Sequence, residues 1–295
     1  MISPFDAVDF EPLTRPVDAS AVRESERRLG RTAIRSRVGD GVTTGCVTGI
    51  VVVVGVLFAG AFAMGPLSGG SPWWWLPCGI VLALTALLIA WIVRRVVHAA
   101  RTGPEVRWRL TEFFAANGIQ LVLEVPDPDY RSTVFGEGRL NPRLVDVTRW
   151  FDGAVEVGQF RYLVPGYRGA RSPQQWGYAR MPLTPSAPDL LLDAASNNAP
   201  WKAGALTGII DVREPTKLVA ANGARFTLWA WRRDLPRATA LADQEFVDLL
   251  SRFPVDLEIT GGVAYLYWDM PLQFADEERW RWIFAVAESL RTRVG

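Results

Sequence analysis

The sequence has 295 residues, a formal net charge of +1, two cysteines and one histidine. A charge so close to zero lacks the basic excess of a nucleic-acid-binding protein, so we expect no nucleic-acid partner. Cys46, Cys78 and His98 all precede residue 102, so the rest of the chain has no ligands for a Cys/His zinc site and no histidine for acid–base catalysis. We therefore expect no metal and no cofactor.

The first 40 residues form a tail that changes in character along its length. Residues 1–18 are acidic and contain several prolines, which predicts a mobile segment. Residues 19–38 are rich in arginine and favour a basic helix. We consider two interpretations of this helix, an anchor for anionic lipids or the ordinary positive flank of a membrane span.

From Gly41 to Val93 the chain runs for 53 residues without Asp, Glu, Lys or Arg. Two apolar runs in this stretch, Val42–Met64 and Trp75–Val93, are each long enough to cross a bilayer, which takes about 20 helical residues. Turn-forming residues 65–72 separate them. The pattern predicts a transmembrane helical hairpin over residues 41–98, surrounded by the lipid bilayer.

Arginines flank this hairpin at both ends. Six lie between residues 23 and 37, and three lie between residues 94 and 101, whereas residues 65–72 carry no charge. Basic residues beside membrane spans are retained on the cytoplasmic side. We therefore expect a protein of the bacterial plasma membrane with both termini in the cytoplasm.

Residues 102–295 predict a cytosolic α+β domain with a largely antiparallel sheet and helices packed on one face. The helix of the second apolar run continues, after a break at Gly103-Pro104, to Asn117-Gly118. Residues 126–153 follow no clear pattern, apart from a turn at their start. The expected strands are Ile119–Val125, Val155–Val164, Trp176–Met181, Asp189–Asp193, Leu206–Val212, Arg225–Trp231, Asp256–Thr260 and Val263–Trp268. The expected helices are Thr239–Phe253 and Phe274–Arg293.

A loose set of motifs resembles those of one kind of membrane protein. The set comprises Tyr162 in one strand, Trp176-Gly177 in the next, and Asp193 followed by the pair Asn197-Asn198. With them, the chain resembles a family of uncharacterised actinobacterial integral membrane proteins that have two N-terminal transmembrane helices and a cytosolic C-terminal domain. The resemblance implies this architecture and carries no activity.

The sequence offers little for catalysis. It contains neither a GxxxxGK[ST] phosphate loop nor a GxSxG serine motif. Carboxylate chemistry stays open as an alternative, through Asp193, Asp211, Asp256 or Glu258, and would make the chain a carboxylate- or metal-dependent hydrolase. We expect instead a non-enzymatic binding or scaffold domain at the inner face of the membrane, with a protein partner or a second copy of the chain. A subunit of an oligomeric transporter is the other alternative.

The best place for a binding site lies between the strand at Trp176 and residues 193–201. Aromatic side chains would supply its walls, and nearby polar side chains would supply donors and acceptors. The candidate residues are Tyr162, Trp176, Tyr178, Asp193, Asn197 and Asn198. In the alternative interpretation, the asparagines only shape a turn and the aromatic residues only fill the core.

Overall fold

The computed structural model describes residues 4–29, 75–136, 139–165, 171–197, 214–269 and 275–294. The chain divides into two compact units. Unit 1 consists of Met1–Thr14 together with Leu110–Gly295, and unit 2 consists of Arg15–Arg109. Unit 2 is thus inserted into unit 1 along the sequence, after the first 14 residues.

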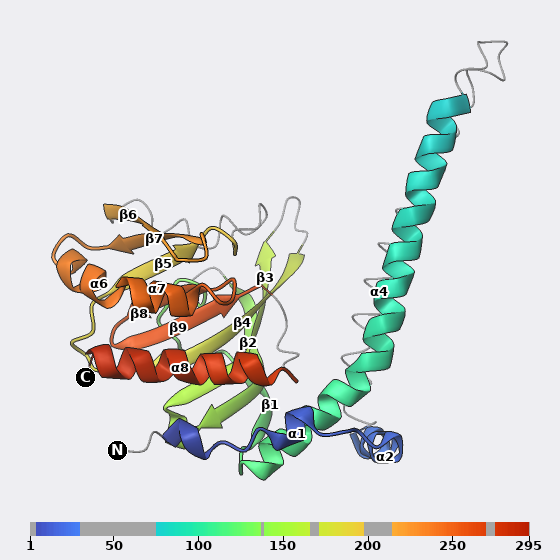
Figure 1. Ribbon diagram of the computed structural model, residues 1–295, viewed down its shortest axis with the longest axis horizontal. Helices are drawn as coiled ribbons and strands as arrows, with labels where there is room; N and C mark the ends of the chain where they lie inside the picture. The colour runs from blue at the N-terminus through green and yellow to red at the C-terminus, as the bar shows by residue number, and fades with distance from the viewer. Residues whose placement is uncertain are drawn as a thin grey trace. The chain divides into compact units, whose positions relative to one another are not determined.

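An antiparallel sheet of nine strands forms the centre of unit 1 in the part of the chain that the structure describes (Figure 1). The strands follow the order β1-β2-β3-β4-β9-β8-β5-β7-β6, and every neighbouring pair is antiparallel. They are β1 (Leu121–Pro126), β2 (Leu140–Trp150), β3 (Val155–Pro165), β4 (Arg171–Pro182), β5 (Leu190–Ala194), β6 (Glu214–Val219), β7 (Arg225–Ala230), β8 (Asp256–Thr260) and β9 (Val263–Trp268). The predicted α+β class with a largely antiparallel sheet is confirmed.

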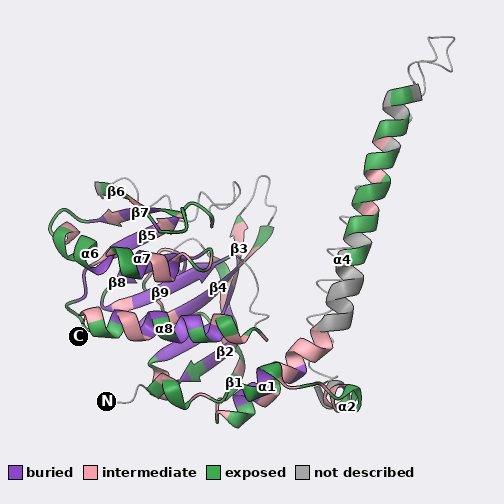
Figure 2. Ribbon diagram, in the orientation of Figure 1, coloured by how far each residue is buried: buried purple, intermediate pink, exposed green. Residues whose placement is uncertain are grey.

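Helices cover one face of this sheet (Figure 1). They are α6 (Leu235–Leu241), α7 (Gln244–Leu250) and α8 (Glu277–Val294). Their apolar sides join alternate strand residues in the larger hydrophobic core, and Figure 2 shows this central region as buried. Trp150 of β2 lies at its centre, with ring centroids 5.2 Å from both Trp280 and Phe284 of α8. The predicted apolar stripe of the last helix is confirmed, because Trp280, Ile283, Phe284, Ala287 and Leu290 are all buried.

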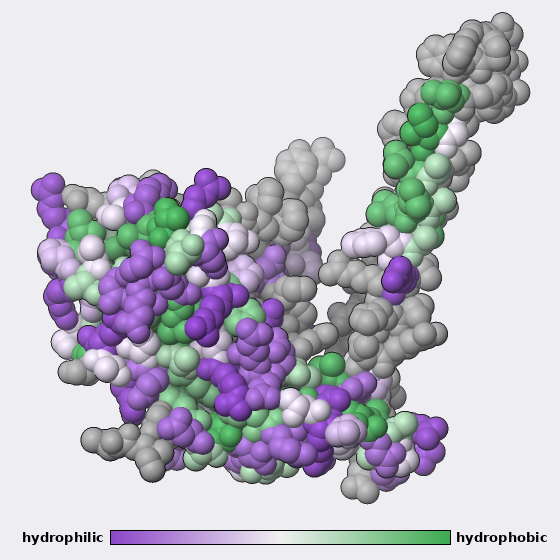
Figure 3. All heavy atoms as spheres, in the orientation of Figure 1, coloured by the Kyte–Doolittle hydropathy of each residue, from purple (hydrophilic) through white to green (hydrophobic). Residues whose placement is uncertain are grey.

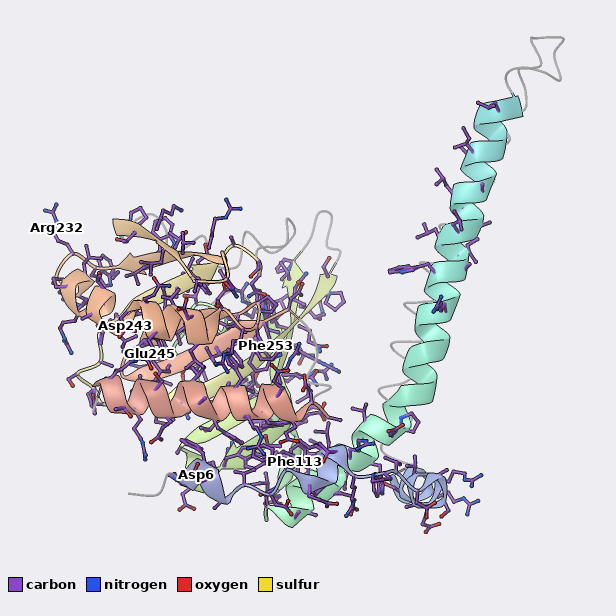
Figure 4. All side chains as sticks on the ribbon, in the orientation of Figure 1. Asp6, Phe113, Arg232, Asp243, Glu245 and Phe253 are labelled. Atoms are coloured by element: carbon purple, nitrogen blue, oxygen red, sulfur yellow. The ribbon has the colours of Figure 1, made fainter. Side chains whose placement is uncertain are left out.

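Two helices, α6 and α7, replace the single helix that the sequence predicts over Thr239–Phe253. The helical structure is interrupted at Ala242 and Asp243. The carboxylate of Asp243 accepts a hydrogen bond of 2.9 Å from the backbone N–H of Phe246 and so caps the N-terminus of α7. Arg293 of α8 pairs with Asp243 and, at 3.2 Å, with Glu245; Figure 4 labels both acids. The apolar period continues through both helices, so it does not reveal the break.

The strands β2 and β6 are absent from the sequence prediction. In β2 the pairing register shifts at two points, and Asn141 and Asp146 have positive φ angles of 50° and 53°, so the two-residue alternation is lost. The outermost strand β6 contains Pro215, which an edge strand tolerates. The predicted turn Asn222-Gly223 does join β6 to β7, with Gly223 at φ 82°. The predicted strand Leu206–Val212 lies outside the described residues.

Residues 4–14 are folded, contrary to the prediction of a mobile segment over residues 1–18. They form the short helices η1 (Pro4–Ala7) and α1 (Glu11–Thr14). Phe10 and Leu13 are buried in the larger core, only 7% and 3% exposed. The prediction was wrong because it rested on the acidic and proline-rich composition of the segment alone. A few apolar side chains are enough to fold such a segment when they pack into a core that the rest of the chain forms.

In unit 2 the structure describes α2 (Ala19–Leu29) and the larger part of α4 (Trp75–Ala116). The predicted break at Gly103-Pro104 is wrong, since Pro104 lies inside a continuous α4. Figure 3 shows apolar residues along the early turns of this helix. Among the residues that the structure describes, no helix combines the length and apolar character needed to cross a membrane. The first apolar run and the turn at 65–72 lie outside the described residues.

Candidate functional site

The face of the sheet opposite the helices carries a second, smaller core that mixes aromatic and polar side chains. Strands β2, β3, β4 and β9 supply most of it, and the chain between β1 and β2 covers it with residues 130–135, which we call the covering segment. In this segment Val134 and Phe135 are buried. The ring of Phe135 lies 4.3 Å from Phe160 and 5.4 Å from Tyr178. The apolar residues of this core are Val134, Phe135, Leu144, Val147, Phe160, Tyr162, Trp176, Tyr178, Tyr265 and Tyr267.

Glu156 of β3 is the first of two buried carboxylates that hold the covering segment. Its Oε1 atom accepts hydrogen bonds from the hydroxyls of Tyr130, at 2.6 Å, and Tyr178, at 2.8 Å. Its Oε2 atom accepts one from Arg149 Nε at 2.8 Å. Burial and the adjacent carboxylate raise the pKa of both tyrosines. The hydrogen bond to Glu156 also raises the pKa of Arg149. The tyrosines therefore remain protonated donors to this carboxylate.

Glu258 of β8 is the second of these carboxylates. It accepts hydrogen bonds from the backbone N–H of Thr133, at 3.0 Å, and from the Thr133 hydroxyl, at 2.7 Å. The hydroxyl of Tyr267 donates to it at 3.2 Å and lies 2.6 Å from the Ser132 hydroxyl. Burial raises the pKa of Tyr267 well above its ordinary value, and the Glu258 charge adds to this. The covering segment is thus joined to β3 through one acid and to β8 through the other.

The predicted site residues fall into two groups. Tyr162, Trp176 and Tyr178 belong to the smaller core, where Trp176 Nε1 donates to the Tyr162 hydroxyl at 3.2 Å. Asn197, which follows β5, donates to Asp256 Oδ2 at 2.6 Å and to the backbone carbonyl of Tyr267 at 3.3 Å. Its own N–H donates to the Ala194 carbonyl in a turn.

The two groups meet at β9, because β9 and β8 separate β4 from β5. The ring of Trp176 lies 6.4 Å from that of Tyr267, whose carbonyl Asn197 contacts. Asp193 is half-buried in β5, opposite Thr227. Asn198 and Asp211 lie outside the described residues. The binding role of these residues stays a prediction, and the three buried aromatic side chains offer little surface to a ligand in this conformation.

A second polar group, which the sequence did not suggest, surrounds Gln159 of β3. Gln159 Nε2 donates to Asp146 at 3.1 Å, and its Oε1 atom accepts from Gln175 at 2.6 Å and from Arg161 at 3.3 Å. Burial raises the pKa of Asp146, which lies at the irregular part of β2. The one sequence signal that could have indicated these buried polar groups was the presence of Glu156 and Gln159 among the apolar residues of a predicted strand.

The arrangement suits structural support better than catalysis. Each oxygen of Glu156 accepts a hydrogen bond from a protein group, and so does each oxygen of Glu258 and of Asp256. Carboxylates held in this way fix the loops around them and have little capacity left for a substrate. Within the described part of the chain, no group of three or more His, Cys, Asp or Glu residues is placed to hold a metal ion.

No protein-family model, curated protein or solved structure matches this chain. Any functional assignment therefore rests on the residues and their geometry. The resemblance to actinobacterial membrane proteins stays a prediction.

Proposed function

We propose that the chain is a membrane-anchored protein, and that unit 1 is a binding or scaffold domain held at the inner face of the bacterial plasma membrane. The observation that carries this proposal is which segments of the chain make up unit 1. Residues 4–14 and the residues after Leu110 share one hydrophobic core, although the charge-free stretch 41–93 lies between them in the sequence.

This shared core restricts how the intervening chain can cross a membrane. Phe10 and Leu13 pack in the same core as Phe113 and Phe284, so the chain before the stretch and the chain after it lie in the same compartment. A segment that enters a bilayer between them must return, which requires an even number of crossings. Taken over all its residues, the sequence offers two apolar runs of spanning length, Val42–Met64 and Trp75–Val93, which would fit this requirement; the first run and several side chains of the second lie outside the described residues. The flanking arginines then favour the cytoplasmic side for unit 1.

The surface of α4 supports an apolar environment for unit 2. Among the side chains of this helix that the structure describes, six large apolar ones are exposed, and Leu87 is the most exposed of these at 67%. At 100° per residue they fall within roughly one third of the helix circumference. A stripe of this kind is typical of a surface that contacts lipid or another apolar surface. The six residues are Leu76, Ile80, Leu84, Leu87, Leu88 and Trp91.

The two alternative functions receive less support. The hydrolase alternative relied on Asp193, Asp211, Asp256 and Glu258. Of these, Asp256 and Glu258 are buried and use their oxygens to hold backbone and side-chain donors. The transporter alternative depends on residues of the charge-free stretch that lie mostly outside the described part of the chain.

Membrane fractionation tests the anchoring. We expect the full chain to stay in the membrane pellet after an alkaline carbonate wash, which removes peripheral proteins. Replacing Val53 and Leu57 in the first apolar run together with Leu84 and Leu87 in the second with aspartate should move most of the chain to the supernatant, because two charges cost each span about 5 kcal/mol or more. A matched pair of aspartates at Leu121 and Leu123, which are also exposed apolar residues, should leave it in the pellet. Release of the unaltered chain by carbonate would refute the proposal.

Cross-linking in native membranes tests the binding or scaffold role. We expect unit 1 to form a defined cross-linked complex with a partner protein or with a second copy of the chain. Recovery of the chain only as a monomer, at every cross-linker concentration, would remove the binding role and leave the anchoring intact.

A further inference from the structure

The turn that joins β2 to β3 has an unusual backbone. Its three consecutive residues Phe151, Asp152 and Gly153 form the short helix η3 and have positive φ angles of 53°, 55° and 87°. Glycine adopts this left-handed conformation freely, but a residue with a Cβ atom does so at a cost, and a bulky phenylalanine is rarely found there. Surrounding contacts must therefore hold Phe151 and Asp152 in this conformation.

The N-terminal segment, Pro4–Thr14, supplies one of the contacts that hold the turn. The ring of Phe5 packs against two other rings, with centroids 4.9 Å from that of Phe151 and 5.5 Å from that of Phe284 in α8. The Phe151 ring itself lies 5.8 Å from that of Phe284. The side chain that has to accept the left-handed backbone is thus fixed in a three-ring cluster, and Phe5 is the member that comes from the N-terminal segment.

The chain enters unit 1 from unit 2 at two places, and both adjoining segments pack on this part of β2 and the turn. The N-terminal segment and the last turns of α4 lie side by side. The Asn117 side chain accepts a hydrogen bond from the Asp9 N–H at 2.8 Å and donates one to the Asp9 carbonyl at 2.9 Å. Phe113 of α4 lies 5.2 Å from Trp150, the residue before Phe151. A displacement of either segment therefore acts on the same turn.

The strands on the other side of the turn lead directly to the covering segment. Arg149 is the last residue but one of β2, Glu156 is the second residue of β3, and Arg149 Nε donates to Glu156 at 2.8 Å. Glu156 also accepts a hydrogen bond of 2.6 Å from Tyr130 of the covering segment. Tyr178, one of the predicted binding residues, packs under this segment, with its ring centroid 5.4 Å from that of Phe135. Opening of the covering segment would therefore expose Tyr178.

We propose that the turn Phe151–Gly153 relays the position of the N-terminal segment to the covering segment and so controls access to the smaller core. With Phe5 in place, the left-handed turn keeps Arg149 and Glu156 opposite each other, and the covering segment stays closed. When Phe5 leaves, the turn relaxes to a conformation of lower energy, the pair separates, and the covering segment opens. The relay regulates the binding role proposed above and rests on it for its purpose, but all its contacts lie within unit 1.

Amide hydrogen exchange of the purified full-length chain, with no partner added, tests the relay. The reporter is the N–H of Thr133, which donates to Glu258 at 3.0 Å and is released when the covering segment opens. Phe5→Ala should accelerate exchange at Thr133 at least about tenfold and leave exchange at Leu257 of β8 unchanged. The matched control is Val8→Ala, at another partly buried apolar residue of the N-terminal segment, which should change exchange at Thr133 less than about threefold.

Asp152→Gly separates the relay from a simple loss of packing. Asp152 is exposed, so glycine there removes the cost of the left-handed backbone and keeps the ring contacts of Phe151. Alone, this substitution should slow exchange at Thr133 about threefold, and together with Phe5→Ala it should reduce the acceleration to less than about threefold.

Four results would each overturn the relay. They are unchanged exchange at Thr133 in Phe5→Ala, equal acceleration at Leu257, equal effects of Phe5→Ala and Val8→Ala, and exchange at Thr133 that Asp152→Gly fails to slow. The measurement needs neither a bilayer nor a partner, so its failure would leave the proposed function standing. Failure of the proposed function would appear instead in the membrane fractionation and the cross-linking.

Discussion

The carboxylate of Glu156 illustrates how single residues hold the smaller core together. Two tyrosine hydroxyls and one guanidinium donate to it, and the side chain is 3% exposed. An ionised acid in such a place is tolerated because three donors replace the water it loses. The covering segment reaches the sheet through this residue and through Glu258, so both acids serve as fixed attachment points.

Replacing Glu156 with glutamine should therefore destabilise unit 1. The amide has one acceptor atom fewer and brings an NH₂ group toward existing donors, so we expect the free energy of unfolding to fall by about 2–3 kcal/mol. Chemical denaturation of the full chain measures this change. Glu124→Gln is the control, because Glu124 is half exposed and pairs with Arg143 at the surface; it should cost less than about 0.5 kcal/mol. Equal effects of the two substitutions would contradict the proposed role of Glu156.

Gly177 of β4 is a second position where a single residue controls packing, because its lack of a Cβ atom leaves room for the ring of Trp268. A Cβ atom there would lie 1.8 Å from Trp268 Nε1. We expect Gly177→Ala to lower the free energy of unfolding by about 1–3 kcal/mol through overpacking. In a Trp268→Ala background the same change should cost less than about 0.5 kcal/mol, because the clash is gone. An undiminished cost in that background would show that another neighbour is responsible.

The candidate site was predictable only in part, and its chemistry explains why. Tyr162, Trp176 and Tyr178 stand out in sequence because aromatic residues alternate along strands, and they do share one core. Glu156 escaped attention because a strand acid is usually solvent-exposed, and two of the three donors that make its burial tolerable, the hydroxyls of Tyr130 and Tyr178, come from distant parts of the chain. Tyr130 lies 26 residues away from it.

At the level of elements, the start of α7 shows how capping and charge combine. Burial by itself would raise the pKa of Asp243, but the Phe246 N–H and the Arg293 guanidinium outweigh it, so the pKa lies below its ordinary value of 3.8. A carboxylate with a lowered pKa in the folded state stabilises that state above the unfolded-state pKa. This contribution is lost as the pH falls through the lowered value.

Asp243→Asn isolates the charge, because asparagine also caps a helix. We expect the unaltered chain to be more stable than the variant by up to about 1 kcal/mol at neutral pH, since the Asp243 side chain is partly exposed. The difference should shrink once the pH falls below 3.8 and vanish below the lowered pKa. Unfolding curves recorded across this range measure it, with the exposed Asp6→Asn as the control. A difference that grows toward low pH would contradict the assignment.

The N-terminal segment makes a prediction about local stability. Phe10→Ala removes one of the apolar side chains that pack the segment Pro4–Thr14 into the larger core, namely Phe5, Val8, Phe10 and Leu13, so the segment should detach while the sheet stays folded. We expect amide hydrogen exchange at Asp9, whose N–H donates to Asn117, to accelerate at least about tenfold, whereas exchange in β8 stays unchanged. Equal acceleration in both places would show that the segment does not detach on its own.

Elements with a regular apolar period were predictable, and those with irregular backbone were not. The strands β3, β8 and β9 and the helix α8 follow simple alternation or helical spacing, and each lies close to its predicted position. The strand β4 contains the predicted Trp176–Met181 but begins at Arg171, within residues that the sequence predicts as a loop. β2 was missed because its register shifts and its two residues with positive φ interrupt that alternation. The N-terminal segment was misjudged because its burial depends on a core formed by residues that follow Leu110.

For the whole molecule, the inclusion of residues 4–14 in unit 1 is the feature with the widest consequence. Local patterns do not reveal it, because it joins residues on either side of a 95-residue insertion, Arg15–Arg109. With the charge-free stretch inside this insertion, the shared core predicts that both flanks of the stretch lie on one side of the membrane. The arginine flanks lead independently to the same topology.

Cysteine accessibility tests this central claim most directly. Single cysteines at Asp6, Gly69 and Gly295, in full-length chains that carry Cys46→Ser and Cys78→Ser, are treated with a membrane-impermeant maleimide in intact cells and after permeabilisation. We predict labelling at position 69 in intact cells, and labelling at positions 6 and 295 only after permeabilisation. Labelling of positions 6 and 295 on different sides of the membrane would contradict the shared core and the membrane hairpin together.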